Sequence, residues 1–146
     1  MKFVVGSDHA GFERKEEIKE YLQSKGYQVI DVGCFSQESV DYPDYGFAAA
    51  KKVAKHTAKY GFVFCYTGIG IGIAANKVHG IRCATVNSLD QVDLTRRHND
   101  ANMLSIGTKY IDKETAIAFI EKFLETPFEG GRHDRRIAKL NDYKEV

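Results

Sequence analysis

The chain has 146 residues, of which 21 are lysine or arginine and 20 are aspartate or glutamate, so its formal net charge is +1 at pH 7. This balance predicts no general attraction to nucleic acid or to acidic membranes, and any recognition of anions must be local. No apolar run approaches the roughly 18 residues of a membrane span, so we expect a cytoplasmic enzyme or binding protein. The length fits a single domain, residues 1–146.

The cysteines are three in number, Cys34, Cys65 and Cys83, and none belongs to a C-x-x-C pair. An odd number at wide spacing argues against a disulfide framework and against structural zinc. We therefore expect a fold that needs no metal and no covalent cross-link.

Apolar runs alternate with amphipathic stretches along the chain, which is typical of an α/β protein with a parallel sheet covered by helices on both faces. Five strands are predicted, near residues 2–6, 27–32, 61–65, 81–86 and 103–107. Helices are expected between them. The first helix carries an apolar stripe, and the helix after the fifth strand carries a clearer one at helical spacing: Ala116, Ile117, Ile120, Phe123 and Leu124.

Two further segments are more than plain connections. A long loop runs from Gly33 to Asp44 and carries Tyr42, and loops of this length in compact domains are often functional. Near the end, Gly130-Gly131 permits an unusual turn before an extra C-terminal helix that opens at Arg132. A helix beyond a complete five-strand unit is expected to dock on a second subunit.

The segment after the third strand is the most informative one in the chain. Cys65 ends that strand, Thr67 follows, and the turn reads Gly68-Ile69-Gly70-Ile71-Gly72. Glycines let the backbone turn sharply and present bare N–H groups, so this turn is an anion cradle beside a thiol. The pattern is neither G-x-G-x-x-G nor a P-loop, which makes a nucleotide site a weak interpretation. A tight strand-to-helix connection without a ligand remains an alternative.

Three other sets of residues are candidates for chemistry. Asp8 and His9 follow the first strand, whose loop should meet the Cys65 turn at the carboxyl edge of the sheet, although an Asp helix cap is an alternative. His98 and Asn99 precede the fifth strand and are expected to approach the same edge. Arg132 and Arg136 are four residues apart, hence on one helix face that suits a phosphate or, alternatively, is simply a solvated basic face.

These residues together resemble ribose-5-phosphate isomerase type B, in the wider family that includes the galactose-6-phosphate isomerase subunits. The resemblance spans nearly the whole chain and is carried, in order, by Asp8-His9-Ala10-Gly11, Ser39 to Asp44, Cys65 to Lys77, Gly80-Ile81-Arg82, His98 to Asn102 and Gly130-Gly131-Arg132-His133 with Arg136. It implies a three-layer αβα fold of the Rossmann-like or flavodoxin-like kind, a homodimer or tetramer, and active sites at a subunit interface without metal or nucleotide.

The resemblance also implies roles in an aldose–ketose isomerisation, which needs ring opening, proton transfer between C1 and C2, and stabilisation of an enediolate. Cys65 corresponds to the base, and Thr67 with the amides of residues 68–72 to the anion hole. His98 corresponds to the ring-opening acid, Asp8 to a group near the ring oxygen and Asn99 to one that orients hydroxyls. The phosphate ligands correspond to His9, Arg132 and Arg136, the two arginines coming from the neighbouring chain. Tyr42, within the second motif, is a further substrate-binding candidate.

Two positions refine the resemblance. Some relatives place a glutamate base in the glycine turn, where this chain has Ile71, which leaves Cys65 as the base. The family commonly has glycine between the cysteine and the threonine, whereas this chain has Tyr66. The expected substrates are ribose 5-phosphate and ribulose 5-phosphate, in the non-oxidative branch of the pentose phosphate pathway. Allose 6-phosphate or galactose 6-phosphate, or binding of a sugar phosphate without catalysis, are the alternatives.

Overall fold

The computed structural model describes residues 1–145, so the last residue of the predicted domain, Val146, lies outside the described part. Within these residues five strands alternate with five helices, and a sixth helix follows the fifth. The strands are β1 (Lys2–Ser7), β2 (Gln28–Asp31), β3 (Tyr60–Cys65), β4 (Cys83–Thr85) and β5 (Met103–Gly107). The helices are α1 (Phe12–Ser24), α2 (Tyr42–Ala54), α3 (Ile69–Asn76), α4 (Leu89–Asn99), α5 (Lys113–Glu125) and α6 (Arg132–Asp142). The five predicted strands are all confirmed, each to within about two residues.

The strands form one parallel sheet in the order β2-β1-β3-β5-β4. The last strand of the chain, β5, is therefore an interior strand, and β4 lies at the edge. Every residue of β5 is buried, as expected for a parallel strand covered on both faces. The predicted α/β class with a five-stranded parallel sheet is confirmed.

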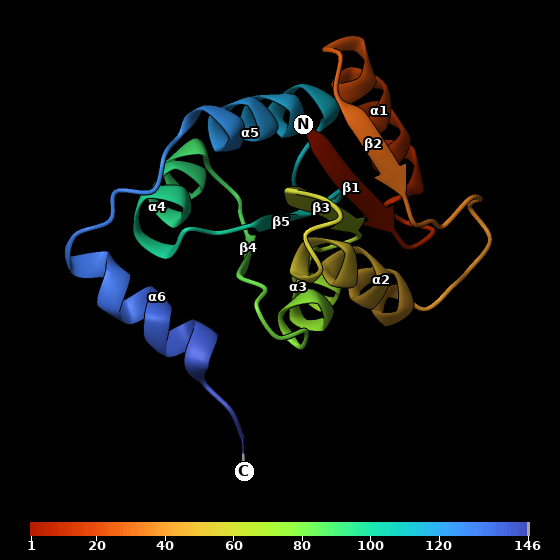
Figure 1. Ribbon diagram of the computed structural model, residues 1–146. Helices are drawn as coiled ribbons and strands as arrows, with labels where there is room; N and C mark the ends of the chain where they lie inside the picture. The colour runs from red at the N-terminus through yellow and green to blue at the C-terminus, as the bar shows by residue number, and fades with distance from the viewer. Residues whose placement is uncertain (146) are drawn as a thin grey trace.

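Helices cover both faces of this sheet (Figure 1). Helices α1, α4 and α5 pack over one face, in a core cluster that includes Phe62 and Phe64 of β3. Helices α2 and α3 pack over the other face, where Val63 and Cys65 of the same strand lie. This alternation follows from the two-residue period of a strand, and it directs the side chain of Cys65 towards α2 and α3.

The predicted apolar stripe of α5 is confirmed. Ala116, Ile120 and Phe123 are fully buried, and Ile117 and Leu124 pack against the same cluster while partly exposed. Within residues 1–145, no helix combines the length and apolar character that crossing a membrane would require.

The last helix differs from the others because it leaves the three layers. Figure 1 shows α6 at the side of α4, standing away from the sheet. Ile137 is buried, but Leu140 on the same helix is 58 % exposed. Arg82, which precedes β4, holds the far end of α6 through a 2.7 Å hydrogen bond from its Nη1 to Asn141 Oδ1. A mostly uncovered amphipathic helix is thus a prominent feature of the surface.

Candidate active site

The thiol of Cys65 lies at the carboxyl end of β3 and is 4 % exposed. Its Sγ accepts a hydrogen bond of 3.1 Å from the backbone N–H of Gly68. Gly68 has a φ of +78°, and a Cβ there would lie 2.7 Å from the backbone nitrogen of Gly107, so this turn requires glycine. The hydroxyls of Ser105 and Thr85 both donate to the carbonyl oxygen of Gly68. Gly68 is therefore hydrogen-bonded through both its N–H and its carbonyl.

The start of α3 presents backbone amides next to this thiol. The Ile69 N–H donates to Thr67 Oγ1 at 3.2 Å, and the Gly72 N–H donates to the Gly68 carbonyl at 3.2 Å. The first amides of a helix have no partner within the helix, which leaves those of Gly70 and Ile71 directed out of the helix end. The amides of the glycine turn that are left without a helical partner are thus chiefly these two, and Gly72 packs closely on Thr85 and Ser105 of the sheet.

Asp8 lies at the same edge because β1 and β3 are neighbours. Ser7 pairs with Phe64, and the backbone N–H of Asp8 donates to the Phe64 carbonyl at 3.3 Å. Asp8 Oδ1 accepts from the N–H of Gly11 at 3.0 Å, which closes the turn before α1, while the N-cap residue of that helix is Gly11. The predicted meeting of the Asp8 loop and the Cys65 turn is confirmed.

His9 and Tyr42 border the same edge. His9 Nδ1 accepts a hydrogen bond of 3.1 Å from the backbone N–H of Val40, which ties the long loop to the end of β1. With Nδ1 used as an acceptor, a neutral His9 carries its proton on Nε2. Tyr42 opens α2, and its ring packs so closely on Gly70 that a Cβ there would lie 2.6 Å from it. The predicted long loop therefore ends at Asp41, three residues earlier than expected, and Tyr42 lies against the glycine turn.

His98 and Asn99 lie elsewhere, and the expectation that they approach the carboxyl edge is wrong. They form the last turn of α4, which runs antiparallel to the strands and so ends at the amino end of β5. There Met103 pairs with Gly61, four residues before Cys65, which places this end about 13 Å from the thiol along the strand. The Nε of Arg82 donates to the Asn99 carbonyl at 3.0 Å and fixes this position.

Arg132 and Arg136 belong to the same region as His98. They occupy the first turns of α6, are exposed, and form no ion pair within the described residues. The next residue after Arg132, His133, stacks its ring on that of His98 with centroids 4.3 Å apart. Burial, together with the adjacent His98 and Arg132, lowers the pKa of His133 from its ordinary value of 6.5.

Single-chain geometry thus divides the predicted site residues into two groups. The thiol group contains Asp8, His9, Tyr42, Cys65, Thr67 and residues 68–72, at the carboxyl edge. The arginine group contains His98, Asn99, Arg132 and Arg136, at the amino edge. Of the other cysteines, Cys34 lies at the carboxyl edge, where its N–H donates to the Ser7 carbonyl at 2.8 Å. Burial raises the pKa of the Cys83 thiol to about 12.

Comparison with known proteins explains the shared pattern. The family model described as Ribose/Galactose Isomerase matches residues 3–140. The chain belongs to this family. Ribose-5-phosphate isomerase B of Escherichia coli is 40 % identical over 95 % of this chain and 93 % of its own length.

Solved structures of family members superpose closely on the fold. Ribose-5-phosphate isomerase B of Clostridium thermocellum has a TM-score of 0.95 at 43 % identity, covering 97 % of this chain and 96 % of that one. The Mycoplasma genitalium enzyme, solved with bound ribulose-5-phosphate, has a TM-score of 0.91 at 38 % identity, covering 96 % and 93 %. The resemblance and the Rossmann-like fold that it implies are both confirmed.

The surroundings of two residues, Tyr66 and His133, became known only from the structure. The departure from the family pattern, Tyr66, is 54 % exposed, and Lys109 Nζ lies 5.4 Å from its ring centroid. The phenol therefore points outward rather than onto the buried thiol. His133 received no role from the sequence because a histidine in a basic helix start resembles a surface residue; only its burial and its stacking on His98 distinguish it.

Proposed function

We propose that the chain is an aldose–ketose isomerase that interconverts D-ribose 5-phosphate and D-ribulose 5-phosphate. The observation that carries this proposal is the buried Cys65 thiol at the carboxyl end of β3, with Asp8 directly after the neighbouring strand β1 and open amides at the start of α3. The relatives support the substrate, since the E. coli protein is a ribose-5-phosphate isomerase B and the M. genitalium protein binds ribulose-5-phosphate.

The mechanism follows from what each group of the thiol edge offers. Cys65, as a thiolate, takes the proton from C2 of the open-chain aldose, and the electron pair forms the enediolate. The same thiol then returns the proton to C1, which gives the ketose. The N–H groups of Gly70 and Ile71 and the hydroxyl of Thr67 are placed to stabilise the negative oxygen of the enediolate. While the carbon-bound proton moves from C2 to C1, the hydroxyl at C2 loses its proton and the oxygen at C1 gains one, so the net reaction is balanced without a co-substrate.

We further propose that the working enzyme is a homodimer, with the possibility of a tetramer built from such dimers, and that its active site lies between subunits. Ring opening and phosphate binding need the arginine group, which in one chain lies at the opposite edge of the sheet from Cys65. A second copy that docks along α6 would bring its own His98, Asn99, Arg132 and Arg136 to this thiol. The apolar residues left uncovered on α3, Ile69 and Ile73, are 55 % and 57 % exposed and support such an interface.

Isomerisation assays with ribose 5-phosphate in heavy water test the function. We expect conversion to the ketose with deuterium entering from solvent at the transferred position. The same assays with allose 6-phosphate and galactose 6-phosphate separate the pentose interpretation from the hexose one. Tight binding of a sugar phosphate without any exchange would instead identify a noncatalytic binding protein.

Subunit mixing tests the shared site. Cys65→Ala and Arg132→Ala proteins are each expected to be inactive, because each leaves every site of a homodimer incomplete. In random mixed dimers, half of the molecules combine one chain of each kind, and one of their two sites is intact. Activity should therefore return to about one quarter of the wild-type value. Mixed dimers that are demonstrably formed and remain inactive would place the whole site within one chain.

We also propose that residues 1–146 act as one domain and that the protein works in the cytoplasm, where phosphorylated sugars are metabolised. Cell fractionation with activity measurements would test the location.

A further inference from the structure

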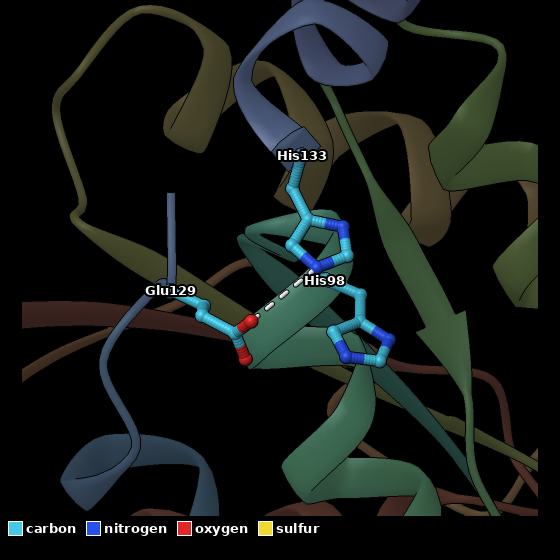
Figure 2. Close-up of side chains that lie close together, drawn as sticks. All are labelled: His98, Glu129 and His133. Atoms are coloured by element: carbon cyan, nitrogen blue, oxygen red, sulfur yellow. Dashed lines mark ion pairs between the residues drawn. The ribbon is translucent and has the colours of Figure 1, made fainter. Parts of the chain in front are cut away.

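Three side chains from separate segments converge beside the arginine group. His98 comes from the last turn of α4, His133 from the first turn of α6, and Glu129 from the connection between α5 and α6. One possible ligand atom from each of the three lies within 4.8 Å of the other two. Figure 2 shows the Glu129 carboxylate directed toward the His133 imidazole, with the His98 ring stacked beside that imidazole. A hydrogen bond of 3.1 Å from the Glu129 N–H to the Arg97 carbonyl fixes the connection to α4.

The buried atom at the centre of this cluster lacks a partner. His133 is 6 % exposed, and its Nε2 has no hydrogen bond within the described residues. The nearest carboxylate oxygen, Glu129 Oε1, is 3.7 Å away, which is too long for a hydrogen bond. A buried polar atom without a partner costs free energy, and native structures contain few of them. The cluster is therefore incomplete as it stands.

We propose that His98, Glu129 and His133 bind a divalent transition-metal ion of the zinc type. Two imidazoles and one carboxylate are a ligand set that zinc uses at sites with an open fourth position. Tetrahedral zinc with ligand bonds of about 2 Å places the donor atoms about 3.3 Å apart. The donor atoms must therefore approach one another by up to about 1.5 Å. One imidazole must also turn out of the stack, because nearly parallel rings direct their nitrogens side by side rather than at one point. Glu129 has a side chain 45 % exposed and can supply much of this movement.

The charges nearby set the expected strength of binding. Arg132 and Arg136 on the same helix repel a cation, whereas Glu129 contributes the only carboxylate of the ligand set. We therefore expect reversible binding that is weaker than that of a structural zinc site. This agrees with a fold that needs no metal, because β4, α4 and α6 are already joined through Arg82, which contacts Asn99 and Asn141.

The consequence for activity rests on the proposed function. If His98 donates the proton that opens the sugar ring, a metal bound to its imidazole removes that proton donor and occupies its place. The ion is then an inhibitor rather than a cofactor. We expect zinc to inhibit the turnover of ribose 5-phosphate reversibly, and a chelator to restore it.

Metal binding is measured first, without substrate, on the intact protein treated with a chelator and then dialysed. Zinc binding is followed by calorimetry, and Co²⁺ serves as a spectroscopic probe because its visible spectrum reports coordination geometry. A Cys65→Ser protein is included because a thiolate is the competing zinc ligand. We expect this variant to bind as the wild type does.

Variants of the cluster then locate the site. Glu129→Gln keeps the shape of the side chain, and we expect it to weaken zinc binding at least tenfold while isomerase activity is retained. His133→Asn should remove the cobalt spectrum. His56→Asn is the matched control, because His56 is exposed on another segment and its left-handed backbone suits asparagine. It should change nothing.

Unchanged zinc affinity in both cluster variants, or loss of binding only in Cys65→Ser, would overturn the proposed site. Binding at the cluster without any inhibition would overturn the inhibitory role. The proposed isomerase function fails in a different way, through absence of turnover by the metal-free wild type, and that outcome leaves the binding measurements intact.

Discussion

Replacing Cys65 by alanine separates the chemistry of the site from its architecture. The thiol is 4 % exposed and lies between the sheet and the layer of α2 and α3. The glycine turn offers no carboxylate that could act as the base instead, because residue 71 is an isoleucine. Its side chain is fully buried in the same cluster. We therefore expect Cys65→Ala to fold and to bind sugar phosphate while losing proton transfer between C1 and C2.

The magnitudes of the two effects differ enough to be measured separately. The substitution removes one buried sulfur atom, worth about 1 kcal/mol of burial. It also removes the acceptor of the Gly68 N–H, worth about 0.5–1.5 kcal/mol. A total loss of about 2 kcal/mol leaves a typical domain of about 5–15 kcal/mol folded. Removal of a general base costs a factor of about 10² to 10⁴ in rate, or about 3 to 5 kcal/mol of activation free energy.

The assay follows turnover of ribose 5-phosphate and exchange of its C2 proton with heavy water. Chemical denaturation of the variant shows separately that it is folded under the assay conditions. Cys34→Ala and Cys83→Ala are the matched controls and should retain most of the activity. Iodoacetamide should inactivate the wild type through Cys65, and substrate should protect it. A near wild-type rate for Cys65→Ala would show that the thiol is structural and would refute the mechanism.

Three further predictions test other parts of the molecule. Arg136→Ala should weaken binding of sugar phosphates roughly ten- to a hundredfold, the worth of one charge-assisted hydrogen bond, and unchanged inhibition by a substrate analogue would remove Arg136 from the site. His98→Asn should impair turnover of cyclic ribose 5-phosphate far more than that of acyclic ribulose 5-phosphate; equal losses in the two directions, after correction for the equilibrium and for ring closure of the product, would assign His98 another role. Burial opposes the charge of Asp31, but hydrogen bonds from Lys15 and Lys19 outweigh it and lower its pKa below 3.8. The stability that these hydrogen bonds contribute is complete above pH 3.8 and is lost as the pH falls through the lowered pKa of Asp31. Lys15→Met should therefore lower the free energy of unfolding by about 1–3 kcal/mol near neutral pH. Denaturant unfolding at a series of pH values should also show a weaker loss of stability in acid.

The sequence by itself determined the elements and half of the site. Apolar runs of strand length alternate with segments that have helical periodicity. This pattern predicts a parallel sheet covered by helices, because the strands are apolar on both faces and each helix has one apolar face to bury. In such a sheet the carboxyl ends of neighbouring strands share an edge, so the meeting of Asp8 with the Cys65 turn followed from residue positions alone. The glycine turn likewise predicted backbone amides beside the thiol.

Only the tertiary structure decided where the arginine group of the predicted site lies. The pairing of β5 with β3, rather than with β4 alone, depends on packing between residues far apart in the chain, and no local pattern encodes it. The direction of α4 then carries His98 to the amino edge, away from Cys65. The burial of His133 and its stacking on His98 arise because α6 folds back along α4, so the cluster with Glu129 exists only in three dimensions.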